Sequence, residues 1–443
     1  MHVSKRTTKH CDSHSRCQPQ ITIYLTNPEE AYTTGNIIQG NVTIQSPSDL
    51  DFQDIRVELT GTSRTLIERW SATPACVPYT EAAHEFLRLS QPDLQLKYPM
   101  DHTLRAGQNY AFSFTFVIPI RLPEGACRHP VSDERVRSAH HSLPPSLGDC
   151  DESGTRSHAD DLSHRKASIG YGIVVTIAQQ DQWPNERILA RRSRSLRIVP
   201  ATGGLLNPDV RCVSVHRPSG IHCTRKEETI KGGTLLRRQH LGTLVAEGAM
   251  SKEIQMHNSP RRAGETVTGT ATARLHYKPA AGAHHTPPQL ERLTTRLRIR
   301  TDISSKPCSD FPQHSDVLFD ATKSRRNDTF PLAERALSGV KWYTCAPAFD
   351  TASPPFAIDL AIPVTLPSNR SFVPTFHSCY VSRTYALDIC MSYTTAGVRG
   401  SIDLCLPLEL ITQYLDEQPK PSDYESSILP GYEYLRASAG SSR

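Results

Sequence analysis

The sequence predicts an all-β protein made of two β-sandwiches joined by a short hinge. Apolar and polar residues alternate with a period of two in many short segments, which is typical of strands with one face in a core. The 33 prolines largely stand between these segments, and no long stretch has helical periodicity. With 443 residues the chain is too long for one compact core, so two domains are expected.

Four strands are predicted in the first half from this alternation. The clearest covers residues 109–118, where every second side chain is aromatic or aliphatic. The residues expected to face the core are Ile21, Ile23, Leu25, Ile55, Val57, Leu59, Tyr110, Phe112, Phe114, Phe116, Ile118, Tyr171, Ile173, Val175 and Ile177. Residues 79–89 (YTEAAHEFLRL) are the one segment that suggests a turn or two of helix.

The second half repeats the pattern. The inward-facing residues predicted for its last three long strands are Phe356, Ile358, Leu360, Ile362, Tyr385, Leu387, Ile389, Met391, Tyr393, Ile402, Leu404, Leu406, Leu408 and Leu410. Pro407 interrupts the last of them. Because proline cannot donate a ladder hydrogen bond, this strand is predicted to lie at an edge or to carry a bulge.

Breaks in the alternation suggest the domain limits. We expect a disordered N-terminus (1–18), a first sandwich (19–200), a second sandwich (207–415) and a disordered tail (416–443). The Pro, Gly-Gly and Asn-Pro elements of residues 199–210 favour a hinge. Residues 127–168, polar and rich in histidine, are predicted to form a mobile loop, and residues 216–250 are irregular in pattern.

Composition limits the cellular compartments and the classes of partner that are expected for this chain. The first residues lack the apolar region of a secretory signal, and no run of 18 apolar residues is present. The twelve cysteines have no paired spacing and are interpreted as reduced cytosolic thiols, several of them buried in strands (Cys379, Cys390, Cys405). A net charge of +5 is modest for this length and gives no reason to expect nucleic acid.

Stretches in both halves of the chain resemble a known family. ITIYLTNPEEAYTTGNIIQGNVTI (21–44), followed by DIRVELTGTSRT (54–65), is similar to the start of arrestin-like N-terminal domains, and HSLPPSLGD (141–149) resembles a segment of fungal members. LPSNRSFVPTFHSCYVSRTYALDI (366–389) looks like the arrestin-like C-terminal domain. The resemblance covers residues 20–411 and implies immunoglobulin-like sandwiches and the alpha-arrestin role. Such adaptors bind cytoplasmic tails or loops of membrane transporters or receptors and recruit a WW-domain (HECT-type) ubiquitin ligase for endocytosis.

The tail carries the expected ligase-docking motif, Leu429-Pro430-Gly431-Tyr432. Proline favours the extended polyproline II form that packs in an aromatic groove, and the tyrosine fills a second pocket. The family usually has PPxY, so Leu429 stands where a proline is expected. A chance Pro-x-Tyr, a sorting or phosphorylation signal at Tyr432 or Tyr434, and a scaffold of the same fold without ligase recruitment are the alternatives.

Basic residues gather in residues 187–197. Five arginines there are candidate contacts for acidic cargo segments, phosphosites or anionic headgroups, namely Arg187, Arg191, Arg192, Arg194 and Arg197. The alternative is a solvated strand edge, where charge guards against unwanted pairing. Ser168 follows RKA, a pattern that suits a basophilic kinase. The resemblance to alpha-arrestins implies a cytoplasmic protein that associates peripherally with the plasma membrane or endosomes.

No metal site, cofactor or enzyme activity is predicted. His10, Cys11, His14 and Cys17 could ligate zinc but lack the separated ligand pairs of structural zinc sites. The pairs His140–His141 and His284–His285 are assigned to loops. No phosphate-binding loop, dinucleotide fingerprint, zinc-protease motif or serine-nucleophile elbow is found.

Overall fold

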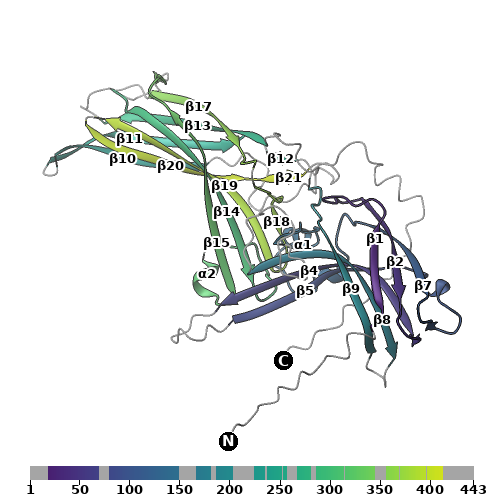
Figure 1. Ribbon diagram of the computed structural model, residues 1–443. Helices are drawn as coiled ribbons and strands as arrows, with labels where there is room; N and C mark the ends of the chain where they lie inside the picture. Colours follow the sequence, from purple (N-terminus) through teal and green to yellow (C-terminus); the bar gives the residue numbers. More distant parts are fainter. Residues whose placement is uncertain are drawn as a thin grey trace, which may run out of the picture.

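Antiparallel strands from each half of the chain stack into a separate sandwich in the computed structural model (Figure 1). The residues that the structure describes are 18–68, 79–148, 166–180, 186–202, 224–234, 237–251, 253–256, 267–280, 286–313, 315–344, 356–368, 370–395 and 397–412. The prediction of an all-β fold is confirmed.

The first sandwich has a three-stranded sheet in the order β1-β2-β7 and a four-stranded sheet in the order β5-β4-β8-β9. Its strands are β1 (Gln20–Leu25), β2 (Ile37–Gln45), β4 (Asp54–Glu68), β5 (Tyr79–Ser90), β7 (Asn109–Val117), β8 (Ala167–Gln180) and β9 (Glu186–Leu196). Smaller elements are the paired strands β3 (Leu50–Asp51) and β6 (Thr103–Leu104), the 3-10 turns η2 (Leu94–Lys97) and η3 (Glu124–Ala126), and the helix α1 (Glu134–His140).

Alternating side chains from both sheets fill one core. On β7, Phe112, Phe114 and Phe116 are buried while their neighbours face outward, as the alternation predicts. Gly40 on β2 is required by a close approach. A Cβ there would lie 2.1 Å from the carbonyl oxygen of Tyr24 and 2.6 Å from the Phe114 ring.

The second sandwich has one sheet in the order β10-β11-β13-β17-β16 and another in the order β15-β14-β19-β18, with β20 also paired to β19. Its strands are β10 (Thr224–Thr234), β11 (Arg237–Met250), β13 (Thr268–Pro279), β14 (Gln289–Ser304), β15 (Lys323–Ala336), β16 (Tyr343–Thr344), β17 (Phe356–Thr365), β18 (Phe376–His377), β19 (Val381–Thr395) and β20 (Val398–Leu408). The parallel pair β12 (Ile254–Met256) and β21 (Leu410–Thr412) and the short helix α2 (Asp316–Phe319) complete it.

The predicted inward faces of the second half are also observed. Tyr385, Leu387, Ile389, Met391 and Tyr393 are buried along β19. β20 pairs with β19 alone among the described strands, so its place at an edge agrees with the prediction from Pro407.

Three expectations about local structure are wrong. Residues 79–89 lie in β5, because pairing with β4 and burial of Phe86, Leu87 and Leu89 outweigh local helix propensity. Most of residues 216–250 form the β10–β11 hairpin, in which Thr224 of β10 pairs with Gly248 of β11 and Thr234 pairs with Arg237.

The segment predicted as a mobile loop contains ordered structure as well. Within 127–148 lie α1 and the buried residues Leu143 and Leu147, which belong to the first core. Leu147 also exchanges both backbone hydrogen bonds with Ile169 of β8, at 2.9 and 2.7 Å. Apolar residues spaced within a polar stretch therefore attach it to the sandwich.

Part of the predicted hinge is attached to both halves. Ala201 N donates to Thr34 Oγ1 at 2.8 Å, and Thr202 N donates to the carbonyl oxygen of Thr412 at 2.9 Å. Residues 203–210, the N-terminal residues 1–17 and the tail 416–443 lie outside the described residues. Among the described helices, none has the length and apolar character needed to cross a membrane.

Candidate functional site

Strand β9 places the predicted arginines along one edge of the first sandwich. β9 is the last strand of the β5-β4-β8-β9 sheet and pairs with β8 (Figure 1). Arg187, Arg191 and Arg192 are exposed on it. We call these three residues the β9 basic edge. Because an edge strand has backbone groups without a ladder partner on one side, this edge offers both arginines and backbone groups to a ligand.

The other two predicted arginines have structural contacts. Arg194 Nη1 donates to the carbonyl oxygen of Ile23 on β1 at 2.8 Å, which ties the two sheets of the first sandwich together. Arg197 Nη2 donates to Ser371 Oγ at 2.6 Å, which links the two halves of the chain. The five arginines therefore do not form a single surface.

An ion pair closes one end of the β9 basic edge. Arg56 on β4 donates to Glu186 at 2.9 Å (Nη2 to Oε2) and lies 2.8 Å from its other oxygen (Nη1 to Oε1). The hydrogen bond that Arg56 donates to the Glu186 carboxylate raises the pKa of Arg56. Glu186 is therefore paired with Arg56, and within the part of the chain that the structure describes no carboxylate is paired with Arg187 or Arg191.

Ser168 lies in strand β8 rather than in a mobile loop. It pairs with Arg64 of β4, and its side chain is half-buried. The apolar neighbours Ala167 and Ile169 are both buried, and their burial holds the backbone of Ser168 in the strand. A kinase would have to open this end of β8, so phosphorylation of Ser168 stays a prediction. The motif Leu429–Tyr432 falls outside the described residues.

The two sandwiches meet through buried contacts. Ile303, Val373, Phe376 and Val381, all from the second half, are members of the first core. Thr65 Oγ1 on β4 donates to the carbonyl oxygen of Ser304 at 2.7 Å, and this hydrogen bond is buried. The second sandwich reaches the first near β4 and α1, through β18 and the lower ends of β14 and β19 (Figure 1).

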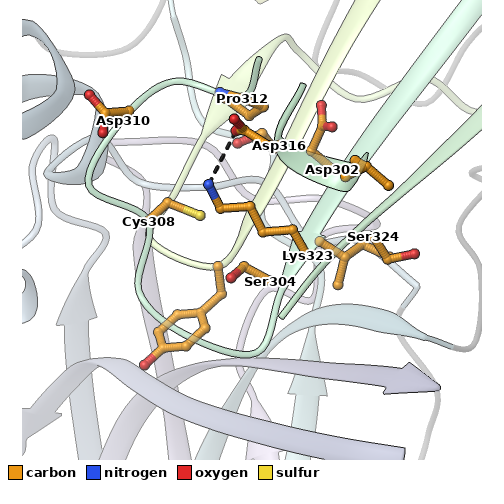
Figure 2. Close-up of a pocket in the computed structure, with 12 residues that line it drawn as sticks. Asp302, Ser304, Cys308, Asp310, Pro312, Asp316, Lys323 and Ser324 are labelled. Atoms are coloured by element: carbon orange, nitrogen blue, oxygen red, sulfur yellow. Dashed lines mark hydrogen bonds and ion pairs between the residues drawn. The ribbon is translucent and has the colours of Figure 1, made fainter. Parts of the chain in front are cut away.

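A small pocket beside this junction is lined by both apolar and charged side chains (Figure 2). Lys323 extends across it, and its Nζ donates to Asp316 Oδ2 at 3.1 Å. Burial lowers the pKa of Lys323, but the hydrogen bond and charge of Asp316 outweigh it, so the pKa is raised. The cavity is about 20 Å³, which is room for a single water molecule and too little for a substrate.

A second group of side chains at the junction was missed by the sequence analysis. Cys127, His129 and His140 come from the first half and Cys379 from the second, and their ligand atoms lie within 4.8 Å of one another. Burial lowers the pKa of His140 to about 4, so its imidazole is neutral near pH 7. Burial, together with the neighbouring Cys127, raises the pKa of the Cys379 thiol.

This grouping also corrects two assignments. His140 is the last residue of α1 rather than a loop residue, and Cys379 lies in the turn between β18 and β19 rather than in a strand. Of the other two cysteines expected to be buried, Cys390 is half-buried and Cys405 is exposed. The only signal in the sequence was the Cys-x-His at 127–129, because the fourth member is more than 200 residues away.

Comparison with known proteins supports the family resemblance in the first half. Residues 21–189 match the family model of the arrestin (or S-antigen) N-terminal domain. A search of curated proteins found no match. The matched residues cover β1 through the start of β9, which is nearly the whole first sandwich. This match shows that the first sandwich is similar to the arrestin N-terminal domain.

Proposed function

We propose that the chain is an arrestin-like adaptor that binds cytoplasmic parts of membrane cargo and recruits a WW-domain ubiquitin ligase of the HECT type through residues 429–432. The observation that carries the proposal is the arrestin N-terminal domain match over residues 21–189. An arrestin domain supports an adaptor or scaffold role in general, and such proteins are in general not enzymes. Cargo ubiquitination, endocytosis and a location at the plasma membrane or endosomes are the specific part of the proposal.

The β9 basic edge supports cargo binding. Its arginines face solvent on a rigid sheet, and guanidinium groups bind carboxylates and phosphates with two parallel hydrogen bonds. An extended acidic or phosphorylated segment of a cargo tail can add to the free side of β9 as a further strand, with its acidic side chains near the arginines. Recognition would then combine backbone pairing with charge.

The tail motif supports ligase recruitment. Two residues of the usual PPxY motif are present, Pro430 and Tyr432, and their side chains are the ones expected to enter the WW-domain groove. Leu429 supplies an apolar contact but does not restrict the backbone to the polyproline II form. Weak docking by the tail becomes effective when cargo is held by the same molecule, because the second contact is then intramolecular.

The test is a pull-down of the full chain on an immobilised WW-domain module, with three tail variants. Tyr432→Ala is expected to abolish binding, whereas Tyr434→Ala, two residues away, is the matched control and should bind as the wild type does. Leu429→Pro is expected to tighten binding by roughly two- to fivefold, because a compatible proline removes about 0.4–1 kcal/mol of chain entropy.

Two results would count against ligase recruitment. Equal binding of the wild type and Tyr432→Ala would mean that the motif is a chance match, and the scaffold without ligase recruitment would then be favoured. Loss of binding with Tyr434→Ala alone would point to a different tyrosine signal in the tail.

A further inference from the structure

We propose that Cys127, His129, His140 and Cys379 bind one structural Zn²⁺ that fastens the two sandwiches together. We call these four residues the junction cluster. Three come from the first half of the chain and one from the second, so a metal held by all four would bridge the halves. This inference does not depend on cargo or ligase binding.

The spacing of the ligand atoms fits a tetrahedral centre. Zinc binds cysteine sulfur at about 2.3 Å and histidine nitrogen at about 2.0–2.1 Å, so neighbouring ligand atoms in a tetrahedron lie roughly 3.3–3.8 Å apart. Cys127 Sγ lies 3.2 Å from His129 Nε2 and 3.7 Å from His140 Nδ1. All pairs lie within 4.8 Å, so the most distant needs to close by about 1–1.5 Å.

The second nitrogen of His129 is held as a metal-binding histidine requires. His129 Nδ1 lies 3.1 Å from the carbonyl oxygen of Pro130. A carbonyl oxygen only accepts hydrogen bonds, so Nδ1 carries the proton and Nε2 keeps its lone pair. Nε2 is the atom that faces Cys127 Sγ. A backbone carbonyl on the outer nitrogen is the usual way in which proteins orient a metal-ligating imidazole.

Three of the four side chains are buried, and one of them lacks a strong hydrogen-bond partner among the described residues. His140, Cys127 and Cys379 are 2%, 4% and 5% exposed, and His129 is half-buried. Among the described residues, the imidazole of His140 has no hydrogen-bond contact besides Cys127 Sγ. A thiol is a weak partner for a buried polar ring, and buried polar groups normally have a good one.

Charge balance favours zinc in this position. Binding would release the two thiol protons to solvent, and two thiolates with one Zn²⁺ and two neutral imidazoles have no net charge. A neutral complex can be buried without the cost of an isolated ion. Two cysteines and two histidines in a closed tetrahedral site are a ligand set typical of structural zinc.

Secondary structure from both halves positions the four ligands. The carboxylate of Asp133 caps α1 by accepting from Val136 N at 2.9 Å, and the buried Val136 anchors the helix that carries His140. Cys308 N donates to the carbonyl oxygen of Cys379 at 2.8 Å, which fixes the turn. Ser132 N donates to the carbonyl oxygen of Ser309 at 2.9 Å, so the loop that carries Cys127 and His129 contacts the segment that is bonded to Cys379 through Cys308.

The test measures metal content in the full chain, purified under reducing conditions with zinc supplied and then freed of loosely bound metal. The wild type is expected to hold one zinc per chain by elemental mass spectrometry. Cys379→Ala and His140→Ala should each lose it. Cys405→Ser, at an exposed cysteine, and Cys17→Ser, in the N-terminal Cys/His group, are the matched controls and should keep it.

Two further measurements keep the test decisive if a variant folds poorly. Cobalt substitution of the wild type should give the visible bands of tetrahedral Co²⁺ and a thiolate-to-cobalt charge-transfer band. Cys379→His, which retains a ligand, should keep the metal while weakening that charge-transfer band. A strong chelator should lower the thermal unfolding midpoint of the wild type, because ligand binding to the folded state stabilises it.

Three results would overturn the proposal. They are a wild-type chain without stoichiometric zinc, zinc that persists in both Cys379→Ala and His140→Ala, and a disulfide between Cys127 and Cys379 found by peptide mass mapping of the reduced preparation. The last would assign the two cysteines to a redox role and leave the histidines as packing residues.

Discussion

At the scale of single residues, one buried carboxylate beside the junction between the sandwiches is paired with two arginines. Asp302 at the end of β14 is 8% exposed and accepts from Arg325 Nε at 2.6 Å and from Arg300 Nε at 2.9 Å. Both arginines also donate to backbone carbonyls of the following loop, Arg300 to Pro312 at 3.1 Å and Arg325 to Gln313 at 2.6 Å. One carboxylate therefore holds two cations and, through them, a loop.

Replacement of that carboxylate should be strongly destabilising. In Asp302→Asn the two arginines lose their counter-charge in a buried setting, and breaking a buried pair costs about 3–5 kcal/mol. Urea unfolding should show the loss as a lower midpoint with little change in slope. Glu334→Gln is the matched control, because Glu334 and its partner Arg292 are both more than half exposed and such pairs contribute about 0–1 kcal/mol. Equal midpoints for the two variants would contradict this account of Asp302.

At the scale of elements, the arginines of β9 can serve two roles on the same edge strand. Charged side chains protect an edge strand from pairing with other chains, and the same charges attract an acidic partner. The solvated edge that the sequence left as an alternative is thus compatible with a binding surface. Only a binding measurement separates the two roles.

Charge reversal on β9 should weaken binding of acidic cargo peptides. In Arg187→Glu/Arg191→Glu, two exposed attractive contacts become repulsive. The loss of binding free energy is roughly 1–2 kcal/mol in total, which corresponds to about a 5- to 30-fold rise in Kd. The effect should shrink as salt is added, since exposed charges are screened. Fluorescence anisotropy of a labelled phosphopeptide would measure it.

The control for this experiment carries the same change in charge. Arg121→Glu/Lys341→Glu reverses two exposed cations that are not part of β9 and should leave the Kd near that of the wild type. If both double variants weaken binding equally, the interaction follows net charge and the β9 basic edge has no special role.

At the scale of the whole molecule, the two sandwiches share buried surface. Phe376 of β18 comes from the second half of the chain, is 7% exposed and belongs to the core of the first sandwich. Together with Val373 and Val381 it makes the stability of the first sandwich depend on residues far away in sequence. The junction is therefore part of the fold rather than a loose linker.

Truncation of this aromatic ring should destabilise the first sandwich. Phe376→Ala removes a buried ring and leaves a cavity, at a cost of about 3–5 kcal/mol. Hydrogen exchange should show lost protection in β4 and β8, although the substitution lies in the second half. Phe319→Ala, the same change at a side chain that is 87% exposed, should leave exchange unaltered. Loss of protection confined to the second sandwich would contradict a shared core.

The alternation in the sequence predicted the strands and their inward faces because burial of one face of a sheet is a local, period-two requirement. It therefore found β7, β19 and β20 with the correct residues buried. It failed for β5, where YTEAAHEFLRL has helical composition and strand pairing with β4 decides the structure. It also failed for residues 127–148, where a few apolar side chains attach an otherwise polar segment to the core.

The sequence by itself determined the all-β class, the core-facing residues of the main strands and the arrestin-like character of the first half. Only the tertiary structure decided how distant segments meet. It divided the five predicted arginines between an exposed edge and structural contacts, and it brought Cys379 to Cys127, His129 and His140. The physical reason is that periodicity and motif spacing record short-range order along the chain. The packing of two sandwiches against each other joins residues whose separation in sequence contains no signal of their contact.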